Sequence, residues 1–142
     1  MRGLIASKEI EVRFSDTDAM GVIWHGNYLR YFEDGREYFG KKFSIEYLDI
    51  HNMGFFVPIA ESFIKHLDTI NYGDKVEVRI KFVYNKAAKL EFKYELFNLT
   101  TNSLSATGSS IQVFIDIENR NMILSKPQFF TDWENKQDWV DV

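Results

Sequence analysis

Apolar and polar residues alternate along two long runs in the middle of the chain, which is the pattern of β-strands with one buried face. The apolar members of the first run are Val76, Val78, Ile80, Phe82 and Tyr84, and those of the second are Leu90, Phe92, Tyr94 and Leu96. A short segment, residues 85–88, separates the two runs. The pattern predicts an antiparallel hairpin whose strands share one apolar face.

Further segments show weaker strand patterns. Residues 55–67 are strand-like, but Pro58 removes one hydrogen bond from a ladder, so we expect an edge strand or a bulge there. Near the N-terminus Ile10, Val12 and Phe14 alternate with charged residues, and residues 122–124 predict a short closing strand. Residues 104–117 predict the last long strand, with a buried face formed by Ile111, Val113, Ile115 and Ile117.

One segment has the three- and four-residue spacing of an amphipathic helix. Its apolar side consists of Tyr28, Tyr31, Phe32, Gly35, Tyr38 and Phe39, and Gly40-Lys41-Lys42 marks its end. Because glycine costs about 1 kcal/mol relative to alanine inside a helix, we expect a sheet or a partner's backbone to approach closely at Gly35. A second, shorter helix is predicted from Ser44, its cap, to Gly54, with Ile45 and Leu48 on its apolar edge.

These elements predict an α+β fold, in which a helix near the N-terminus is covered by four or five antiparallel strands. The 142 residues, of which 45% are hydrophobic, fit one domain that spans residues 1–142. We expect the tail after about residue 127 to be peripheral, either irregular and held by its aromatic residues or frayed.

Composition excludes several classes of function. The 17 Lys and Arg residues against 21 Asp and Glu residues offer no broad basic field for a nucleic-acid backbone. The lack of cysteine removes disulfides, thiolate zinc sites and a thiol nucleophile. No apolar stretch approaches the ~20 residues of a membrane span, and the first residues lack the apolar core of a signal peptide. We therefore expect a cytoplasmic protein without a membrane span.

The chemistry is expected between residues 15 and 28, where a strand pattern gives way to the helix. This stretch carries two carboxylates, Asp16 and Asp18, and the imidazole of His25. Unpaired backbone N–H groups at a helix start can hold a carbonyl oxygen that gains negative charge, and a carboxylate on the preceding loop can act as base or nucleophile. We expect Asp18 to take this part and Asp16 to bond nearby backbone in an Asx-turn.

Two other interpretations of polar residues in this chain are set aside. The spacing Asp16-x-Asp18-x-x-Gly21 imitates the start of an EF-hand loop, but Met20 and Asn27 stand where further calcium ligands would be needed. No metal site is therefore expected. The remaining histidines, at positions 51 and 66, have no comparable setting, and neither is assigned a role.

The strand, loop and helix together resemble the hot-dog fold acyl-CoA thioesterases of the 4-hydroxybenzoyl-CoA thioesterase family, in the branch related to the Tol-Pal-associated thioesterase. The motif reads Asp16-Thr17-Asp18-Ala19-Met20-Gly21-Val22-Ile23-Trp24-His25-Gly26-Asn27-Tyr28. Weaker likenesses are residues 72–78, as the turn into a long strand, and Ala106-Thr107-Gly108 in the last long strand. The resemblance covers roughly residues 8 to 127. It implies a long helix wrapped by a curved antiparallel sheet, and hydrolysis of an acyl-CoA thioester to free acid and CoA.

The resemblance also implies roles for single residues of the motif. Asp18 matches the catalytic carboxylate, which acts as nucleophile or general base. His25 matches the residue at the helix start whose backbone N–H holds the thioester carbonyl, and branches with histidine here are thought to use the side chain as well. Gly26, Asn27 and Tyr28 match positions that orient the helix start and bind substrate.

Partners follow from the same resemblance. The family forms dimers, commonly tetramers, with acyl-CoA across the subunit interface, so we expect a homodimer or homotetramer and no cofactor besides the CoA of the substrate. Lys86 and Lys89 are predicted to bind the nucleotide phosphates, from their charge and from the place of this loop in the family. An acyl-carrier protein is the alternative carrier. Met20 departs from the small residues or proline common at its position, which affects the expected shape of the acyl pocket.

Two other functions are compatible with the fold. A hot-dog dehydratase or hydratase would act on hydroxyacyl or enoyl thioesters, but it needs a histidine and a carboxylate placed for proton transfer at the β-carbon, in motifs that this chain lacks. A non-catalytic acyl-thioester binding module would bind acyl-CoA without releasing thiol, whatever stands at Asp18.

Overall fold

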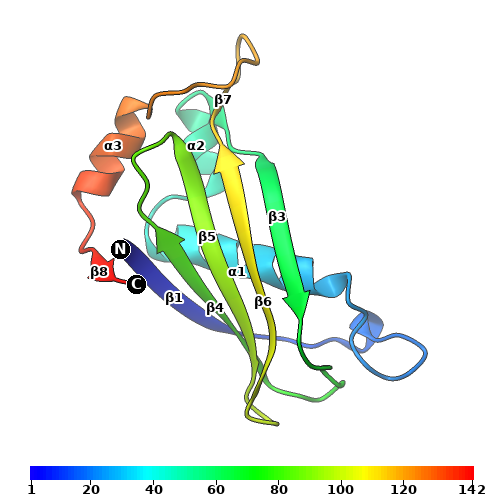
Figure 1. The fold of residues 1–142 in the computed structure, drawn as a ribbon. Coiled ribbons are helices and arrows are strands. Elements are labelled where there is room, and N and C mark those ends of the chain that lie inside the picture. Colours follow the sequence, from blue (N-terminus) through cyan, green and yellow to red (C-terminus); the bar gives the residue numbers. More distant parts are fainter.

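The computed structural model describes all 142 residues, and Figure 1 shows the arrangement of its elements. The strands are β1 (Arg2–Ile10), β2 (Phe55–Phe56), β3 (Ile59–His66), β4 (Val76–Val83), β5 (Lys89–Asn98), β6 (Ser103–Val113), β7 (Ile115–Asp116) and β8 (Val140–Asp141). The α-helices are α1 (Asn27–Lys42), α2 (Tyr47–Asn52) and α3 (Gln128–Asn135), and a 3₁₀ turn covers Phe14–Asp16. None of the helices combines the length and apolarity needed to cross a bilayer.

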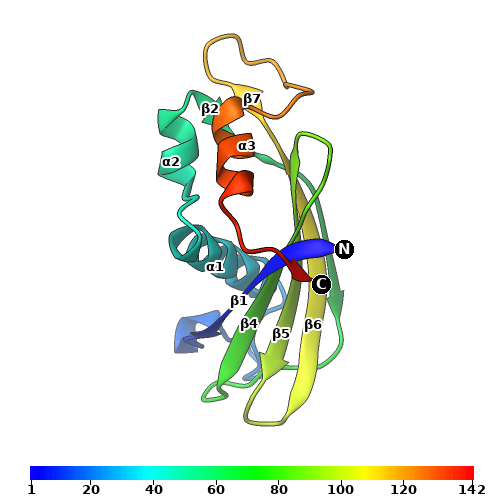
Figure 2. The same ribbon diagram turned by 90° about the vertical axis from the view of Figure 1, so that its left-hand side faces the viewer.

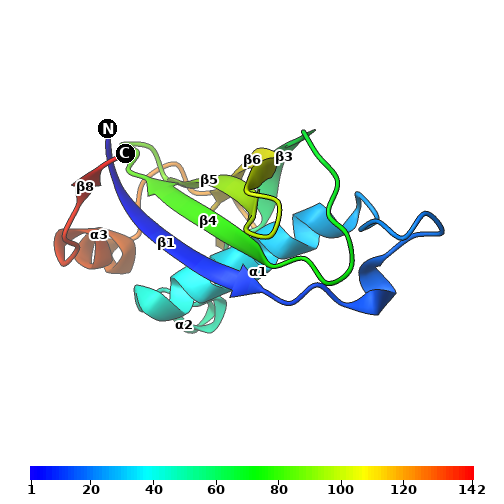
Figure 3. The ribbon, with the colours of Figure 1, turned by 90° about the horizontal axis from the view of Figure 1, so that it is seen from below.

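Six strands form one antiparallel sheet in the order β3-β6-β5-β4-β1-β8, while β2 and β7 pair separately. The predicted hairpin is confirmed as β4 and β5, with Val76 opposite Asn98 and Val83 opposite Glu91. All three helices lie on the same side of the sheet (Figure 2). Seen from below, α1 crosses this side and its first turn extends past β3 (Figure 3). The apolar core fills the space between the helices and the sheet.

Helix α1 confirms the predicted helix, its apolar side and its end. The buried residues on this side are Tyr28, Tyr31, Phe32, Gly35 and Phe39. The close approach expected at Gly35 is also confirmed, because a Cβ atom there would lie 2.9 Å from side-chain carbons of Val78 and Ile80 on β4. The middle of this helix is therefore in direct contact with the sheet.

Strand β6 packs against α1 through small residues, which corrects its predicted buried face. A Cβ atom on Gly108 would lie 2.4 Å from the ring of Phe32. Alternation along the strand places Ala106 and Ser110, both buried, on this same face. The residues predicted to be buried, Ile111, Val113, Ile115 and Ile117, are only half buried. The prediction assumed that the most apolar residues of the strand are buried. The face that packs on α1 carries small side chains instead, because the helix lies close to it.

The first strand and the second helix have other bounds than predicted. β1 already ends at Ile10, and Phe14 lies in the 3₁₀ turn with 74% of its side chain exposed. The α2 cap is Glu46, paired with Asp49 in a capping box, and not Ser44. Leu48 is 67% exposed, so it is not on the buried side of α2. Both errors arise because local spacing does not show where the chain turns away from the core.

The tail after residue 127 is ordered, which corrects the expectation of an irregular segment. It forms α3, with Phe130 and Trp133 buried, and then β8, which pairs with the start of β1. The largely buried Lys126 and Glu134 form an ion pair at 2.9 Å. Both chain ends therefore lie side by side (Figure 1). The closing strand predicted at 122–124 is reduced to one bridge between Met122 and Ile115.

Strand β3 forms a free edge of the sheet, as Pro58 indicated. The pairing of β3 with β6 shifts register between Ile59 and Glu61, immediately after this proline. No strand of the chain covers its other side, and at the opposite edge of the sheet β8 pairs with only Arg2 and Gly3 of β1. The side chain of Phe63 on this edge strand is 62% exposed. One long edge is thus left open for pairing.

Gly108→Ala is expected to lower the free energy of unfolding by about 2 kcal/mol, because overpacking is costly at a close contact. The new methyl group would overlap the Phe32 ring at 2.4 Å and the Phe63 carbonyl oxygen at 2.7 Å. Urea unfolding followed by circular dichroism measures the change. Ser109→Ala, next to it on the other face, is the matched control and should change stability by less than about 0.5 kcal/mol. Equal stability of both variants would contradict the close packing of α1 on β6.

Candidate active site

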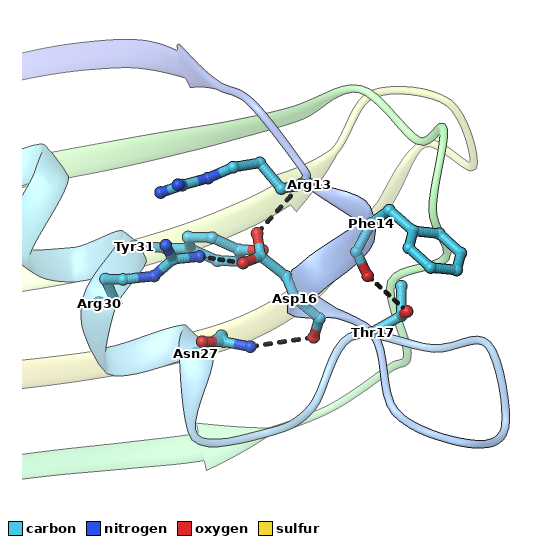
Figure 4. A network of polar contacts seen from close by, with 7 residues as sticks. All are labelled: Arg13, Phe14, Asp16, Thr17, Asn27, Arg30 and Tyr31. Atoms are coloured by element: carbon cyan, nitrogen blue, oxygen red, sulfur yellow. Dashed lines mark hydrogen bonds and ion pairs between the residues drawn. The ribbon is translucent and has the colours of Figure 1, made fainter.

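The loop between β1 and α1 is held by one buried carboxylate, that of Asp16 (Figure 4). Only 3% of this residue is exposed. Its Oδ2 accepts hydrogen bonds from the Arg13 N–H at 3.0 Å and the Tyr31 hydroxyl at 2.8 Å, and its Oδ1 pairs with the Arg30 guanidinium. Asp16 has the structural role expected of it, but it does not form the expected Asx-turn. Its carboxylate accepts from the backbone of Arg13, three residues earlier, and from two side chains of α1. The Asx-turn is formed by Asp18 instead, which accepts from the Met20 N–H.

Opposing effects act on the pKa of Asp16, and the net result lies below its ordinary value of 3.8. Burial raises the pKa, because the charged carboxylate loses water. The Arg13 N–H, the Tyr31 hydroxyl and the Arg30 guanidinium lower the pKa and outweigh burial. Burial and the neighbouring carboxylate also raise the pKa of Tyr31 far above its ordinary value. At neutral pH the carboxylate is therefore charged and the phenol keeps its proton.

The two arms of the loop bond to each other through their backbones. The Asp18 N–H donates to the Val22 carbonyl at 2.8 Å, and the Trp24 N–H donates to the Asp16 carbonyl at 2.9 Å. At the tip, Gly21 has a φ of +78°, which favours glycine. The loop is thus a tight hairpin that holds Asp18 on one arm while the other arm leads into α1.

The half-buried carboxylate of Asp18 keeps one oxygen free. Its Oδ1 accepts a hydrogen bond from the Met20 N–H at 2.8 Å, and its Oδ2 accepts none from the protein. The Met20 side chain is 80% exposed. The bulky residue at this position therefore extends into solvent, and the loop presents a carboxylate with a defined orientation.

Helix α1 begins with backbone N–H groups that have no acceptor in the chain. The N–H groups of His25 and Gly26 donate no hydrogen bond, and no acidic residue lies in the first turn. The Trp24 ring covers Gly26 so closely that a Cβ atom there would lie 2.3 Å from it. Because a helix N-terminus carries partial positive charge, these N–H groups can stabilise an anion or a developing oxyanion.

Asn27 and Tyr28 fix the position of this helix start. The Asn27 side chain donates from Nδ2 to the Asp16 carbonyl at 2.9 Å. Tyr28 is buried, and its hydroxyl donates to the Asp68 carbonyl at 3.3 Å. Both side chains are thus engaged within the protein, which fits an orienting part in substrate binding.

His66, which sequence reasoning left without a role, lies beside His25. The two imidazole rings meet edge to face with centroids 5.9 Å apart, and His66 also packs on the Tyr28 ring at 5.0 Å. His66 ends β3, far along the sequence from the motif. No local pattern shows which strand end meets the start of α1, so only the tertiary structure could find this neighbour.

Lys86 and Lys89 lie far from His25 within one chain. Lys86 lies in the β4–β5 turn and Lys89 begins β5, whereas Val76, at the other end of β4, pairs with Ile10 just before the site loop. The eight residues of β4 separate these ends by about 25 Å. Within one chain, Lys86 and Lys89 therefore lie at the opposite end of the sheet from the site loop, and their contact with nucleotide phosphates stays a prediction.

Comparisons with known proteins show what this chain resembles. A family model described as the thioesterase-like superfamily matches residues 12–135. YneP of Bacillus subtilis (strain 168), named as a proposed acyl-CoA thioesterase, is 30% identical over 129 residues, 91% of this chain and 92% of YneP. The solved DHNA-CoA thioesterase from Staphylococcus aureus is 32% identical, with a TM-score of 0.81 over 92% of this chain and 87% of the other.

A more distant structure shares the fold. Slr0204, a 1,4-dihydroxy-2-naphthoyl-CoA thioesterase from Synechocystis, superposes with a TM-score of 0.83 over 94% of this chain and 98% of its own, at 21% identity. The predicted fold is confirmed by these superpositions.

Asp16→Asn is expected to lower the free energy of unfolding by about 2 kcal/mol at pH 7, because the buried carboxylate that accepts from Arg13 and Tyr31 and pairs with the partly exposed Arg30 is lost. Urea unfolding measures the difference. Asp138→Asn, which changes an exposed carboxylate, is the control and should have little effect. An Asp16→Asn protein of unchanged stability would show that the network does not hold the loop.

The stability difference between the native protein and Asp16→Asn should depend on pH. The folded-state pKa of Asp16 lies below its ordinary value of 3.8, so the charged network contributes fully above that value and is lost as pH falls through the folded-state pKa. Unfolding at pH 3, 5 and 7 should give a smaller difference at pH 3 than at pH 5 or 7. A difference that grows toward low pH would contradict the lowered pKa.

Proposed function

The chain belongs to the thioesterase-like superfamily and is a thioester hydrolase, and from this premise we propose that it hydrolyses acyl-CoA thioesters at the start of α1. One observation carries the proposal. The free backbone N–H groups of His25 and Gly26 lie on the same short loop that holds Asp18 with one free carboxylate oxygen. These are the two parts that acyl transfer requires, a site for the oxyanion and a base or nucleophile.

In the proposed reaction the thioester carbonyl oxygen lies against the N–H of His25. Attack at the carbonyl carbon moves an electron pair onto this oxygen, and the N–H groups and the helix dipole stabilise the charge. Asp18 either attacks to form a mixed anhydride that water then opens, or takes a proton from the attacking water. On both routes the C–S bond breaks, CoA leaves as a thiolate that takes up a proton, and the acyl group becomes a free acid.

The other motif residues support this arrangement. The imidazole of His25 is exposed between Trp24, at 5.3 Å, and His66, and in this proposal it lines the site that receives the thioester. Gly26, Asn27 and Tyr28 hold the helix start in place. The reaction is proposed to need no cofactor besides the CoA of the substrate. The cytoplasmic location stays a prediction.

A second copy of the chain completes the enzyme in this proposal. The two β3 strands pair antiparallel about a two-fold axis perpendicular to the sheet, so one continuous sheet carries both α1 helices on the same face. The free β3 edge and its exposed Phe63 support this interface, because an uncovered edge is a template for pairing. A homotetramer would combine two such dimers.

The same pairing would bring Lys86 and Lys89 of one copy near the candidate active site of the other. Antiparallel β3 strands set the β4–β5 turn of one copy at the same end of the joined sheet as the α1 start of the other. The pantetheine arm would then run between subunits, with its phosphates toward Lys86 and Lys89 of the second copy. An acyl group on an acyl-carrier protein would enter by the same route.

Asp18→Asn is expected to lower kcat for acyl-CoA hydrolysis by about 100-fold or more, because the free carboxylate is lost. Thiol release followed with a disulfide dye measures it, and the absence of cysteine in the chain removes any protein background. Aliphatic and aromatic acyl-CoAs and an acyl-carrier-protein thioester serve as substrates. Asp138→Asn is the matched control and should retain full activity. Tight binding of acyl-CoA without thiol release in all proteins would favour the binding-module alternative.

The purified protein is expected to have at least twice the mass of the chain in light scattering at micromolar concentration. Phe63→Asp should shift it toward the monomer, because two new carboxylates would lie close together near the two-fold axis. Leu99→Asp is the control at an exposed position away from β3. A native protein that is monomeric, or a dimer insensitive to Phe63→Asp, would count against pairing through β3.

A further inference from the structure

The imidazole of His66 has no hydrogen-bond partner in the chain, although the backbone around it is firmly held. His66 ends β3, which pairs with β6, and the N–H groups of residues 67 and 68 both donate to the Ser105 carbonyl, at 2.9 and 3.1 Å. The side chain is exposed and packs on the rings of Tyr28, at 5.0 Å, and His25, at 5.9 Å. His66 therefore offers an unpaired imidazole at a defined place beside the candidate active site.

The polar groups closest to His66 along the chain are engaged with other partners. The Asp68 carboxylate accepts from the Thr69 N–H at 2.8 Å and from the Ser103 hydroxyl at 3.2 Å. The Tyr28 hydroxyl donates to the Asp68 carbonyl at 3.3 Å. His66 itself forms no ion pair. A hydrogen bond that ties two parts of the chain together, which is a common structural role of histidine, is therefore absent here.

The arm of the site loop that leads into α1 lies between Asp18 and the segment that follows β3. The trans peptide unit between Val22 and Ile23 shows this, because its carbonyl and its N–H point in opposite directions. The carbonyl accepts from the Asp18 N–H at 2.8 Å, and the N–H donates to the Ile70 carbonyl at 2.7 Å. Asp18 is therefore on one side of this arm, and the segment that continues from His66 is on the other side.

This arm ends at the free N–H groups of His25 and Gly26. Asp18 approaches the helix start from one side of the arm, and His66 approaches it from the other side, where its ring meets the His25 ring. A thioester whose carbonyl oxygen is held by these N–H groups would have Asp18 on one side of its carbonyl carbon and His66 on the other. The thioester atom beside His66 would then be the sulfur, which leaves in the reaction.

We propose that His66 gives the proton that the CoA sulfur takes up when the C–S bond breaks. This inference rests on the proposed function, and it adds a proton donor for the leaving group to the carboxylate and the oxyanion site. Among side chains, imidazole exchanges a proton most readily near neutral pH, and it serves most often as general acid or base. Asp18 acts at the carbonyl carbon, whereas His66 acts at the sulfur.

The proposed step balances on both routes open to Asp18. The electron pair of the C–S bond moves to the sulfur, and the proton of the protonated His66 imidazole moves to the same atom, which gives the free thiol of CoA. The water molecule that enters the acid product supplies two protons. One of them restores the protonated imidazole, and the other is released when the acid ionises.

Two thioesters of the same acyl group, one with CoA and one with 4-nitrobenzenethiol, test this role. An aliphatic thiolate needs a proton on leaving, whereas the nitrophenyl ring spreads the negative charge of its thiolate. His66→Phe keeps a ring against Tyr28 and His25 but has no proton to give. Its kcat should fall by about 100-fold for the CoA thioester and by less than about threefold for the nitrophenyl thioester. Equal losses with both substrates would show that His66 acts through packing, and would overturn the inference.

His66→Gln is the second variant, because an amide can donate a hydrogen bond but cannot give up its proton. It should show the same dependence on the leaving group, and native activity on the CoA thioester would overturn the inference. His51→Phe is the matched control, because His51 is also exposed and packs on two aromatic rings, those of Tyr47 and Phe56. This variant should keep full activity on both substrates.

Two further variants separate this inference from the proposed function. If His25→Phe shows the dependence on the leaving group and His66→Phe does not, the proton comes from His25, and the inference is overturned while the proposed function stands. Asp18→Asn should lose activity on both thioesters, because the carboxylate acts before the sulfur leaves. Full activity of Asp18→Asn, or no hydrolysis by the native protein, would overturn the proposed function and this inference with it.

Discussion

The buried Asp16 carboxylate is the interaction on which the functional region depends. It joins the end of the first strand, through the Arg13 N–H, to the first turns of α1, through Arg30 and Tyr31. Its backbone carbonyl accepts from Trp24 and from the Asn27 side chain. One residue thus fixes both arms of the site loop and the helix start that they lead to. The hydrogen bonds and the ion pair of Asp16 therefore hold in place the loop and the helix start, which carry the two unpaired N–H groups and the free oxygen of Asp18.

A second constraint is the short distance between α1 and the sheet. Gly35 on the helix and Gly108 on β6 both lie where a Cβ atom would overlap a neighbour, so the helix sinks deeply onto the strands at its middle. Toward its C-terminal end α1 contacts the sheet through the larger ring of Phe39, which packs on Phe82 and Phe92, and α2 and α3 lie on the same side of the sheet (Figure 2). A cavity of about 370 Å³ lies between these three helices and the sheet. Close packing and an apolar cavity thus lie at successive positions along one helix.

A third feature of the structure is the edge of the sheet at β3, which has no partner strand. Strand β3 ends at the site, at His66, and begins at the cavity, near Val57, while its outer side has no partner. A symmetric pair of chains would close this edge.

The sequence by itself determined the central hairpin, the extent and buried side of α1, the close approach at Gly35 and the loop that carries Asp18 and His25. These features depend on residues that are close together in the chain. Apolar residues at every second position indicate the buried face of a strand, and apolar residues three or four positions apart indicate the buried face of a helix. Only the tertiary structure decided the rest. Small residues on β6 face the helix, α3 forms from the tail, and His66 meets His25, because packing between distant segments sets these contacts. The local spacing of apolar residues does not show which strand ends contact a helix.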